Sequence, residues 1–361
     1  SAVAIDQDSV TQAWIGAGAA VTAEGSVAVS AASDSDYTMI AGSVAIGKTG
    51  GIGASTSILL RDDTTEAWIA DGAGVSGLAL RGTISVLTGT KDGSGTRQTQ
   101  AMKGVSVTAV SWEDITTIAA GAAAGQSIGI AGSATVETLD DETNAWIGAA
   151  TINSAAGPGA DQSVNIVASD LLDMVGGAGS LGVGLQGVGF GAAADVAIFD
   201  KDTTALIKAG ADVSAEKNVI VRATSGEDIL SVAANIGAGQ VGLAGAASVY
   251  VLDTLTQASI QGGVTPGSGA VVNADGSVVV QADSEATFLT IAGQISGGSS
   301  AAVGVANTTL VKTDVTEASI GNYAEVTGLG QAAKGSVSVL TGGKDANDAR
   351  ISESVFGVAV V

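Results

Sequence analysis

The sequence predicts an all-β protein built as an elongated parallel β-solenoid, and three observations lead to this class. An eight-residue segment recurs six times, short runs alternate apolar with polar residues, and no amphipathic helix pattern occurs in the 361 residues. The composition agrees, since 46% of residues are hydrophobic, only 3% are aromatic and 53 are glycine. Small and β-branched side chains favour thin, closely stacked sheets.

The recurring segment has the pattern DxxTxAxI. Its threonines are spaced 54, 78, 60, 53 and 60 residues apart, at Thr11, Thr65, Thr143, Thr203, Thr256 and Thr316. We therefore predict six repeat units of about 53–78 residues in one continuous domain over 1–361. The units start near Asp8, Asp62, Asp140, Asp200, Asp253 and Thr313, and only the last lacks the Asp.

Two further elements complete each unit. About a dozen residues after the repeat comes a strand such as "GSVAVSA" from Gly25, in which Val27, Val29 and Ala31 alternate with smaller or polar residues. A Gly/Ala-rich element such as "IGIAGSATVETLD" then leads into the next repeat. Glycine on one strand face lets another sheet approach closely, either within the chain or between rods.

The repeat itself has a structural interpretation. Its Asp suits a corner, where the carboxylate accepts backbone N–H bonds, and its Thr, Ala and Ile point inward on alternate positions. A solenoid turn of about twenty residues predicts two or three turns in each unit and about eighteen in the chain. At a strand spacing of roughly 4.8 Å the rod would be about 85 Å long.

The beginning of the sequence falls inside a unit. The first residues, "SAVAIDQDSVTQAWI", match the middle of the third unit, "SATVETLDDETNAWI". We expect the chain to be a segment or subunit of a longer array.

Charge and missing residue types exclude several functions. The chain has 14 Lys and Arg against 36 Asp and Glu, a net charge of −22, which repels nucleic acid and anionic membrane surfaces. It has no Cys and no His, so disulfides, thiolate sites and imidazole catalysis are excluded. The uncharged runs 116–136 and 174–194 are glycine-rich, and we predict that neither spans a membrane.

Three tryptophans form a candidate binding surface. Trp14, Trp68 and Trp146 occupy the same outward position of the first three units, where Leu206, Ser259 and Ser319 follow. Such a stripe could stack on sugar rings or on a neighbouring rod, or it could be covered by a loop or an adjacent strand.

The acidic residues of the repeats form a candidate calcium site, because Ca²⁺ takes six to eight oxygen ligands. Successive corners on the order of 10 Å apart would be too distant to share an ion, so solvated turn aspartates are the alternative. No other cofactor is expected. The candidate ligands are Asp8, Asp62, Asp63, Asp140, Asp141, Asp200, Asp202 and Asp253.

One segment interrupts the repeat. The insertion "TGTKDGSGTRQTQAMKG" at 88–104 is unusually basic for this chain, and we predict a projecting loop or an extra strand. A polysaccharide-processing enzyme would need an irregular cleft, whereas the repeats present a repeated surface, so we expect no enzyme activity.

The pattern "GxAGSxxVxxLxxxTxAxIGxGAxVxAxGSVxVxA" covers essentially the whole chain and resembles giant repetitive bacterial exoproteins, the filamentous-haemagglutinin-like and leukotoxin-like adhesins. The resemblance implies secretion, a right-handed β-solenoid and a role in adhesion or biofilm matrix. We expect an extracellular rod or filament that stacks end to end with itself, with polysaccharide or cell-surface binding through the Trp stripe as the alternative.

Overall fold

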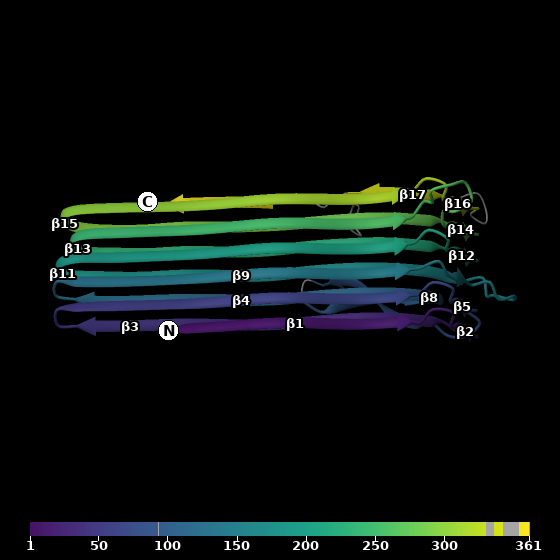
Figure 1. Ribbon diagram of the computed structural model, residues 1–361, viewed down its shortest axis with the longest axis horizontal. Coiled ribbons are helices and arrows are strands. Elements are labelled where there is room, and N and C mark those ends of the chain that lie inside the picture. Colours follow the sequence, from purple (N-terminus) through teal and green to yellow (C-terminus); the bar gives the residue numbers. More distant parts are fainter. Residues whose placement is uncertain (93, 330–335, 342–353, 361) are drawn as a thin grey trace.

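The computed structural model describes residues 1–92, 94–329, 336–341 and 354–360 (Figure 1). Over these residues it contains strands and no helix, and its two larger sheets are parallel. The prediction of an all-β chain with parallel sheets is therefore confirmed.

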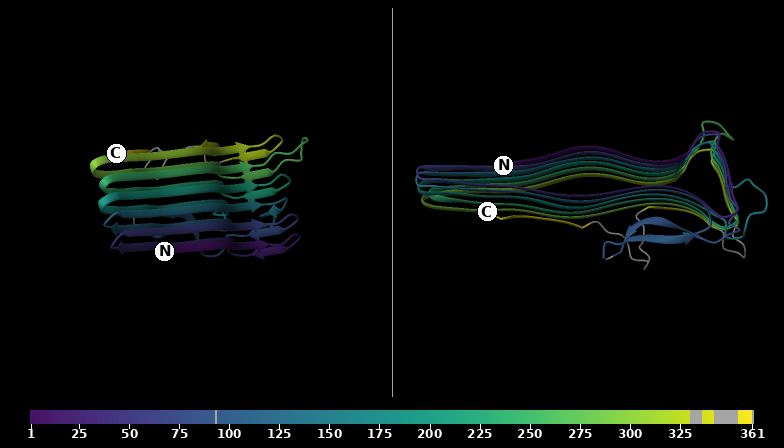
Figure 2. Two further views of the ribbon diagram at one scale, coloured as in Figure 1. Left: turned by 60° about the vertical axis from the view of Figure 1, so that its left-hand side comes forward. Right: turned by 90° about the horizontal axis from the view of Figure 1, so that it is seen from below.

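Two long layers of strands run side by side, diverge at one end and meet at the other, which we call the narrow end (Figure 2). The last three long strands turn at the narrow end and so belong to both layers. The first layer holds β1 (Ala2–Ile15), β4 (Gly50–Ile69), β9 (Ile128–Ile147) and the second parts of β11 (Ser163–Ile207), β13 (Val219–Ile260) and β15 (Val278–Ile320). The second layer holds β3 (Val27–Gly47), β8 (Gly104–Gly125), the first parts of β11, β13 and β15, and then β17 (Val337–Thr341) and β18 (Ser354–Val360).

A third sheet of short strands closes the wide end. The chain enters it through a tight turn in which Gly18, Gly72 and Gly210 have φ values of 68°, 72° and 79°, and Tyr323 takes the equivalent place with φ of 60°. Glycine adopts this left-handed conformation at little cost. The strands are β2 (Ala20–Ala23), β5 (Gly74–Gly77), β10 (Thr151–Ile152), β12 (Asp212–Ala215), β14 (Val271–Ala274) and β16 (Glu325–Gly328).

Each repeat segment pairs directly with the next. Asp62 pairs with Asp8 on one side and with Asp140 on the other, and Asp200 pairs with Asp253. The prediction of two or three turns per unit is therefore wrong, because one unit makes one circuit of the cross-section. Six circuits at roughly 4.8 Å stack to about 30 Å, whereas one twenty-residue strand runs about 65 Å. The predicted rod of about 85 Å is replaced by a wide, flat stack.

The repeat lies inside long strands and not at a corner. Asp62 stands within β4, and the turn follows only at Gly72. The predicted corner role of the Asp is wrong, because the strand continues on both sides of it. The alternation is confirmed in the same strand, since Thr65, Ala67 and Ile69 are buried.

The space between the two long layers becomes thinner toward the narrow end, and the side chains that point into it become smaller. Along β4 the inward residues run Leu59, Ser57, Ser55, Gly53 and Gly51. A Cβ on either glycine would lie 2.5 Å from a carbonyl oxygen of the opposite layer. The glycine-rich segments therefore serve internal packing, which is one of the two alternatives that the sequence left open.

The insertion forms the only antiparallel pair among the described strands. Together with residues 84–87 before it, the insertion folds as the hairpin of β6 (Ile84–Lys91) and β7 (Arg97–Met102), which lies outside the second layer (Figure 2). The hairpin packs closely on that layer, because Ser169 Oγ donates a hydrogen bond to the Gly89 carbonyl at 2.5 Å. The Arg97 guanidinium lies 4.5 Å from the centre of the Trp112 ring, which is fully buried. The extra-strand alternative for this segment is thus confirmed.

Candidate functional site

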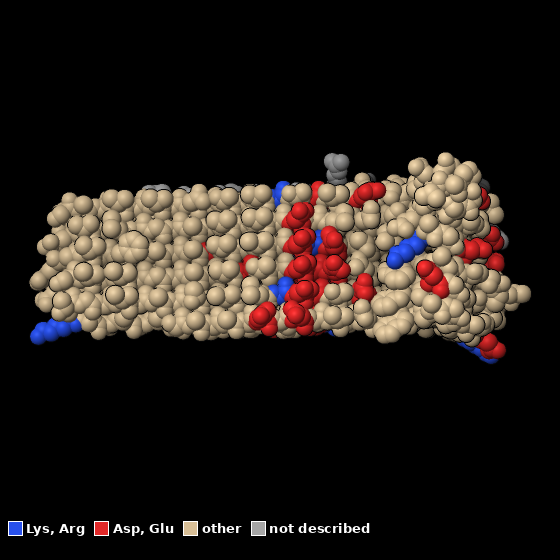
Figure 3. Space-filling view, in the orientation of Figure 1, with Lys and Arg blue, Asp and Glu red and all other residues tan. Residues whose placement is uncertain are grey.

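The outer face of the first layer carries a ladder of aspartates. Each of the first five units has an exposed Asp, and parallel in-register pairing places it directly beside the equivalent Asp of the neighbouring unit. Together these aspartates lie in the red band of Figure 3. Two residues further along the strands, Glu142 and Asp202 form a second acidic pair. Adjacent strands lie about 4.8 Å apart, so the predicted separation of 10 Å or more is wrong. We call the five residues the acidic ladder: Asp8, Asp62, Asp140, Asp200 and Asp253.

Like charges on adjacent strands disfavour ionisation. The pKa of Asp200 is raised by partial burial and by its neighbours Asp140 and Asp253. The pKa values of Glu142 and Asp202 are raised by the same two causes. Directly opposed like charges destabilise a sheet, so protons or cations at this face would relieve the repulsion.

The three predicted tryptophans form a second ladder on the same face. The rings of Trp14 and Trp68 stack with centroids 5.2 Å apart, and those of Trp68 and Trp146 stack 5.5 Å apart. Their planes are within 11° of parallel. The ammonium of Lys208 lies over the Trp146 ring, 3.4 Å from its centroid.

This stacking decides which parts of the rings are accessible. Both faces of Trp68 are covered by the neighbouring rings, and Lys208 covers one face of Trp146. Trp14 is 58% exposed, and among the described residues only the Trp68 ring stacks on it. A sugar ring could therefore stack flat on Trp14, whereas the other two tryptophans present mainly their edges.

A charged cluster lies inside the molecule between the two long layers. The first layer contributes two cations, and the Lys201 ammonium lies 2.8 Å from Asp170 Oδ1 and 3.7 Å from Glu113 Oε2 on the second layer. The guanidinium of Arg61 lies 3.5 Å from Glu113 Oε1 and also contacts Asp63. We call this set the interior cluster: Arg61, Asp63, Glu113, Asp141, Asp170, Lys201 and Glu227.

The interior cluster contains five carboxyl groups and two cations, so it tends to hold protons. Burial and the charge of Asp170 raise the pKa of Glu113 to about 8. Burial and Glu113 raise the pKa of Asp141 to about 7. Burial would lower the pKa of Lys201, but the surrounding carboxylates outweigh it and raise that pKa.

The structure separates the predicted calcium ligands. Asp63 and Asp141 point inward and are buried, whereas Asp62, Asp140 and their stacked equivalents point outward. Among the described residues, three carboxylates converge within 4.8 Å of one another in one place, at Asp63, Glu113 and Asp141. A guanidinium nitrogen of Arg61 lies within 3.7 Å of a carboxylate oxygen of each of these three residues.

A second pair of buried acids lies closer to the narrow end. Thr117 donates a hydrogen bond to Glu137, while Thr135, Ser231 and Tyr250 donate to Asp195. Burial and Asp195 raise the pKa of Glu137 to about 9. Hydroxyl donors thus take the place that cations have in the interior cluster.

Sequence reasoning missed the inward charges although a signal for them existed. Arg61 and Asp63 have the same parity as Thr65, Ala67 and Ile69, so strict alternation already directs them inward. Glu113, which contacts Arg61, and Asp170, which pairs with Lys201, come from the opposite layer, and no pattern within the repeat identifies them.

Comparison with protein-family models, with curated proteins and with solved structures finds no match to this chain. In the part of the chain that the structure describes, no helix has the length and apolar character needed to cross a membrane.

Proposed function

We propose that the chain is a structural protein, an extracellular right-handed β-solenoid that acts as an adhesin stalk or a biofilm matrix fibre. The observation that carries the proposal is the in-register stacking of one repeat on the next through both long layers. Such stacking repeats one surface, which suits mechanical extension better than catalysis on a single substrate. We accordingly propose no enzymatic activity.

The outermost circuits support end-to-end stacking. Ala13 and Ile15 on one side, and Ala318 and Ile320 on the other, occupy equivalent places and are only partly buried against the core. A further circuit on either side would cover them and would pair the free strand edges. That circuit could come from more of the same chain or from a second copy, and assembly from separate copies is the version that can be tested directly.

The test is cryo-electron microscopy of the purified chain together with sedimentation at increasing concentration. We expect filaments with a meridional reflection near 4.8 Å, the spacing of stacked strands. The variant Ala13→Glu places a charge in the partly buried end surface and should block assembly. Ala4→Glu, the same change on the outward face of β1, should not. Monodisperse short particles at every concentration would refute self-assembly.

Carbohydrate binding by the Trp stripe is the second candidate, and the exposed face of Trp14 is the observation that favours it. The serines at the equivalent positions of the fifth and sixth units show which replacement the fold accepts there. Replacing Trp14 by Ser should abolish glycan binding if the stripe is the platform, whereas filament formation should persist. Unchanged glycan binding would remove this candidate.

A further inference from the structure

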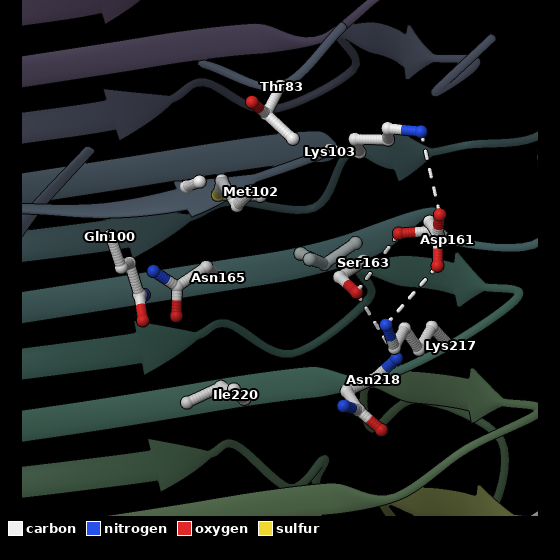
Figure 4. Close-up of a pocket in the computed structure, with 12 residues that line it drawn as sticks. Thr83, Gln100, Met102, Lys103, Asp161, Ser163, Asn165, Lys217, Asn218 and Ile220 are labelled. Atoms are coloured by element: carbon white, nitrogen blue, oxygen red, sulfur yellow. Dashed lines mark hydrogen bonds and ion pairs between the residues drawn. The ribbon is translucent and has the colours of Figure 1, made fainter. Parts of the chain in front are cut away.

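A pocket of about 290 Å³ opens at the base of the β6–β7 hairpin, against the outer face of the second layer (Figure 4). It lies apart from the acidic ladder and the Trp ladder, which are on the first layer. Its walls come from three successive circuits and from the hairpin, so it exists only where the insertion departs from the repeat.

One edge of the pocket is positively charged. Lys103, Asp161 and Lys217 stand one above another at the same corner of three consecutive circuits, as Figure 4 shows. The Asp161 carboxylate lies 3.5 Å from the Lys103 ammonium and 3.3 Å from that of Lys217. The three groups carry a net charge of +1 in a chain whose net charge is −22.

These ion pairs are weakly held. The side chains of Lys217 and Asp161 are 53% and 59% exposed, and both distances are long for a charged hydrogen bond. Exposed pairs of this kind contribute little to stability, so the ammonium groups can turn toward an anion at little cost.

The floor of the pocket contains an amide without partners. Asn165 is only 4% exposed, and neither its Nδ2 nor its Oδ1 has a hydrogen-bond partner in the described part of the chain. Leaving a buried donor and a buried acceptor unpaired costs free energy for each group. A ligand that both donates and accepts hydrogen bonds would recover this free energy.

The remaining walls include apolar surface from Met102 on the hairpin and Ile220 on the neighbouring strand β13. The pocket therefore combines two ammonium groups, an amide that needs a donor and an acceptor, and two apolar side chains. Inorganic phosphate would satisfy the ammonium groups, but as a strong acceptor it would leave the Asn165 carbonyl largely unpaired and gain nothing from the apolar wall.

We propose that this pocket binds a hexuronate unit of an acidic polysaccharide. The carboxylate of the sugar would accept from Lys103 and Lys217 on the pocket side of Asp161, its hydroxyls would donate to and accept from Asn165, and its C–H face would pack on Met102 and Ile220. The volume suits one sugar ring and not an extended ligand. The site is independent of filament formation.

The test is calorimetric titration of the intact chain with glucuronate, glucose, acetate and inorganic phosphate. We expect saturable binding of glucuronate, with the other three at least about tenfold weaker because each lacks one of the recognised features. Glucuronate binding should also weaken as NaCl is raised.

Three variants locate the site. Lys103→Met with Lys217→Met, and separately Asn165→Leu, should each weaken glucuronate binding at least about tenfold, with unchanged circular dichroism. Lys48→Met, at an exposed lysine of the narrow end, removes one positive charge elsewhere and should bind as the wild type does. No binding to the wild type at millimolar glucuronate, equal binding of glucose or phosphate, or full binding by the double variant would each overturn the proposal.

Discussion

Lys201 and Asp170 face one another across the interior, with the ammonium nitrogen 2.8 Å from the carboxylate oxygen and both side chains fully buried. The two residues belong to opposite long layers, although both lie in β11. A shift of one layer against the other by a single pair of residues would separate them. Buried ion pairs of this kind can specify alignment even where they add little net stability.

Lys201→Met should destabilise the chain by about 3–5 kcal/mol, because it leaves Asp170 buried without a cation. Urea denaturation followed by circular dichroism measures the loss. The deficit should shrink in acid, where the orphaned carboxyl group can take up a proton. Lys48→Met serves as the matched control, and equal midpoints for the two variants would contradict the role given to the interior cluster.

Stability should fall as the pH rises from about 5 to about 9. Glu113, Asp141 and Glu137 have folded-state pKa values of about 8, 7 and 9, well above those of unfolded carboxyl groups. The folded chain therefore binds more protons than the unfolded chain, and this contribution is full below the unfolded pKa and is lost as the pH passes the folded values. Urea midpoints across this range give the measurement.

The variant Glu137→Gln tests the contribution of one of these buried carboxyl groups. The amide cannot ionise and can still accept the hydrogen bond from Thr117, so its midpoint should depend less on pH above neutrality than that of the wild type. A wild-type midpoint that rises with pH would show that the buried acids do not behave as described.

Asp140→Asn should stabilise the chain, because Asp140 stands between Asp62 and Asp200 in the acidic ladder. We expect a gain of about 0.2–1 kcal/mol at low salt that shrinks at high salt, since exposed charges are screened. Asp212→Asn, an exposed aspartate of β12 outside the ladder, is the control. A loss of stability in Asp140→Asn at low salt would argue against repulsion.

Calcium should act on the same ladder, whose aspartates are among the candidate calcium ligands of the sequence. Thermal melts with CaCl₂ should rise above those with NaCl of equal ionic strength, because carboxylates on adjacent strands can share a divalent cation. The rise should be smaller in Asp140→Asn. Identical melts in the two salts would leave the ladder as a solvated acidic face.

Gly129 and Gly132 of β9 allow a matched comparison of two substitutions near the narrow end. A Cβ on Gly129 would collide with the Val183 carbonyl of the opposite layer, whereas nothing lies within 4 Å of a Cβ on Gly132. Gly129→Ala should therefore cost about 1–3 kcal/mol or more, and Gly132→Ala should be neutral or slightly stabilising. Equal effects in urea denaturation would contradict the close approach of the layers.

The local pattern of the sequence predicted much of the fold. The alternation of the repeat predicted that Thr65, Ala67 and Ile69 are buried and that Trp68 faces outward, because side chains of a strand alternate with a period of two. The six copies predicted stacking of equivalent residues, since like strands pair in register. The glycine-rich segments predicted a close approach of sheets without deciding which sheets would meet.

The number of circuits per unit and the identity of the interior partners came only from the tertiary structure. A strand can run for eight residues or for twenty with the same alternation, so the period of two could not reveal that one unit makes one circuit. The contacts of Lys201 with Asp170 and Glu113 join opposite layers, and their alignment depends on where the chain turns at the narrow end. Sequence by itself determined which way each side chain points, and the folded stack decided what it meets there.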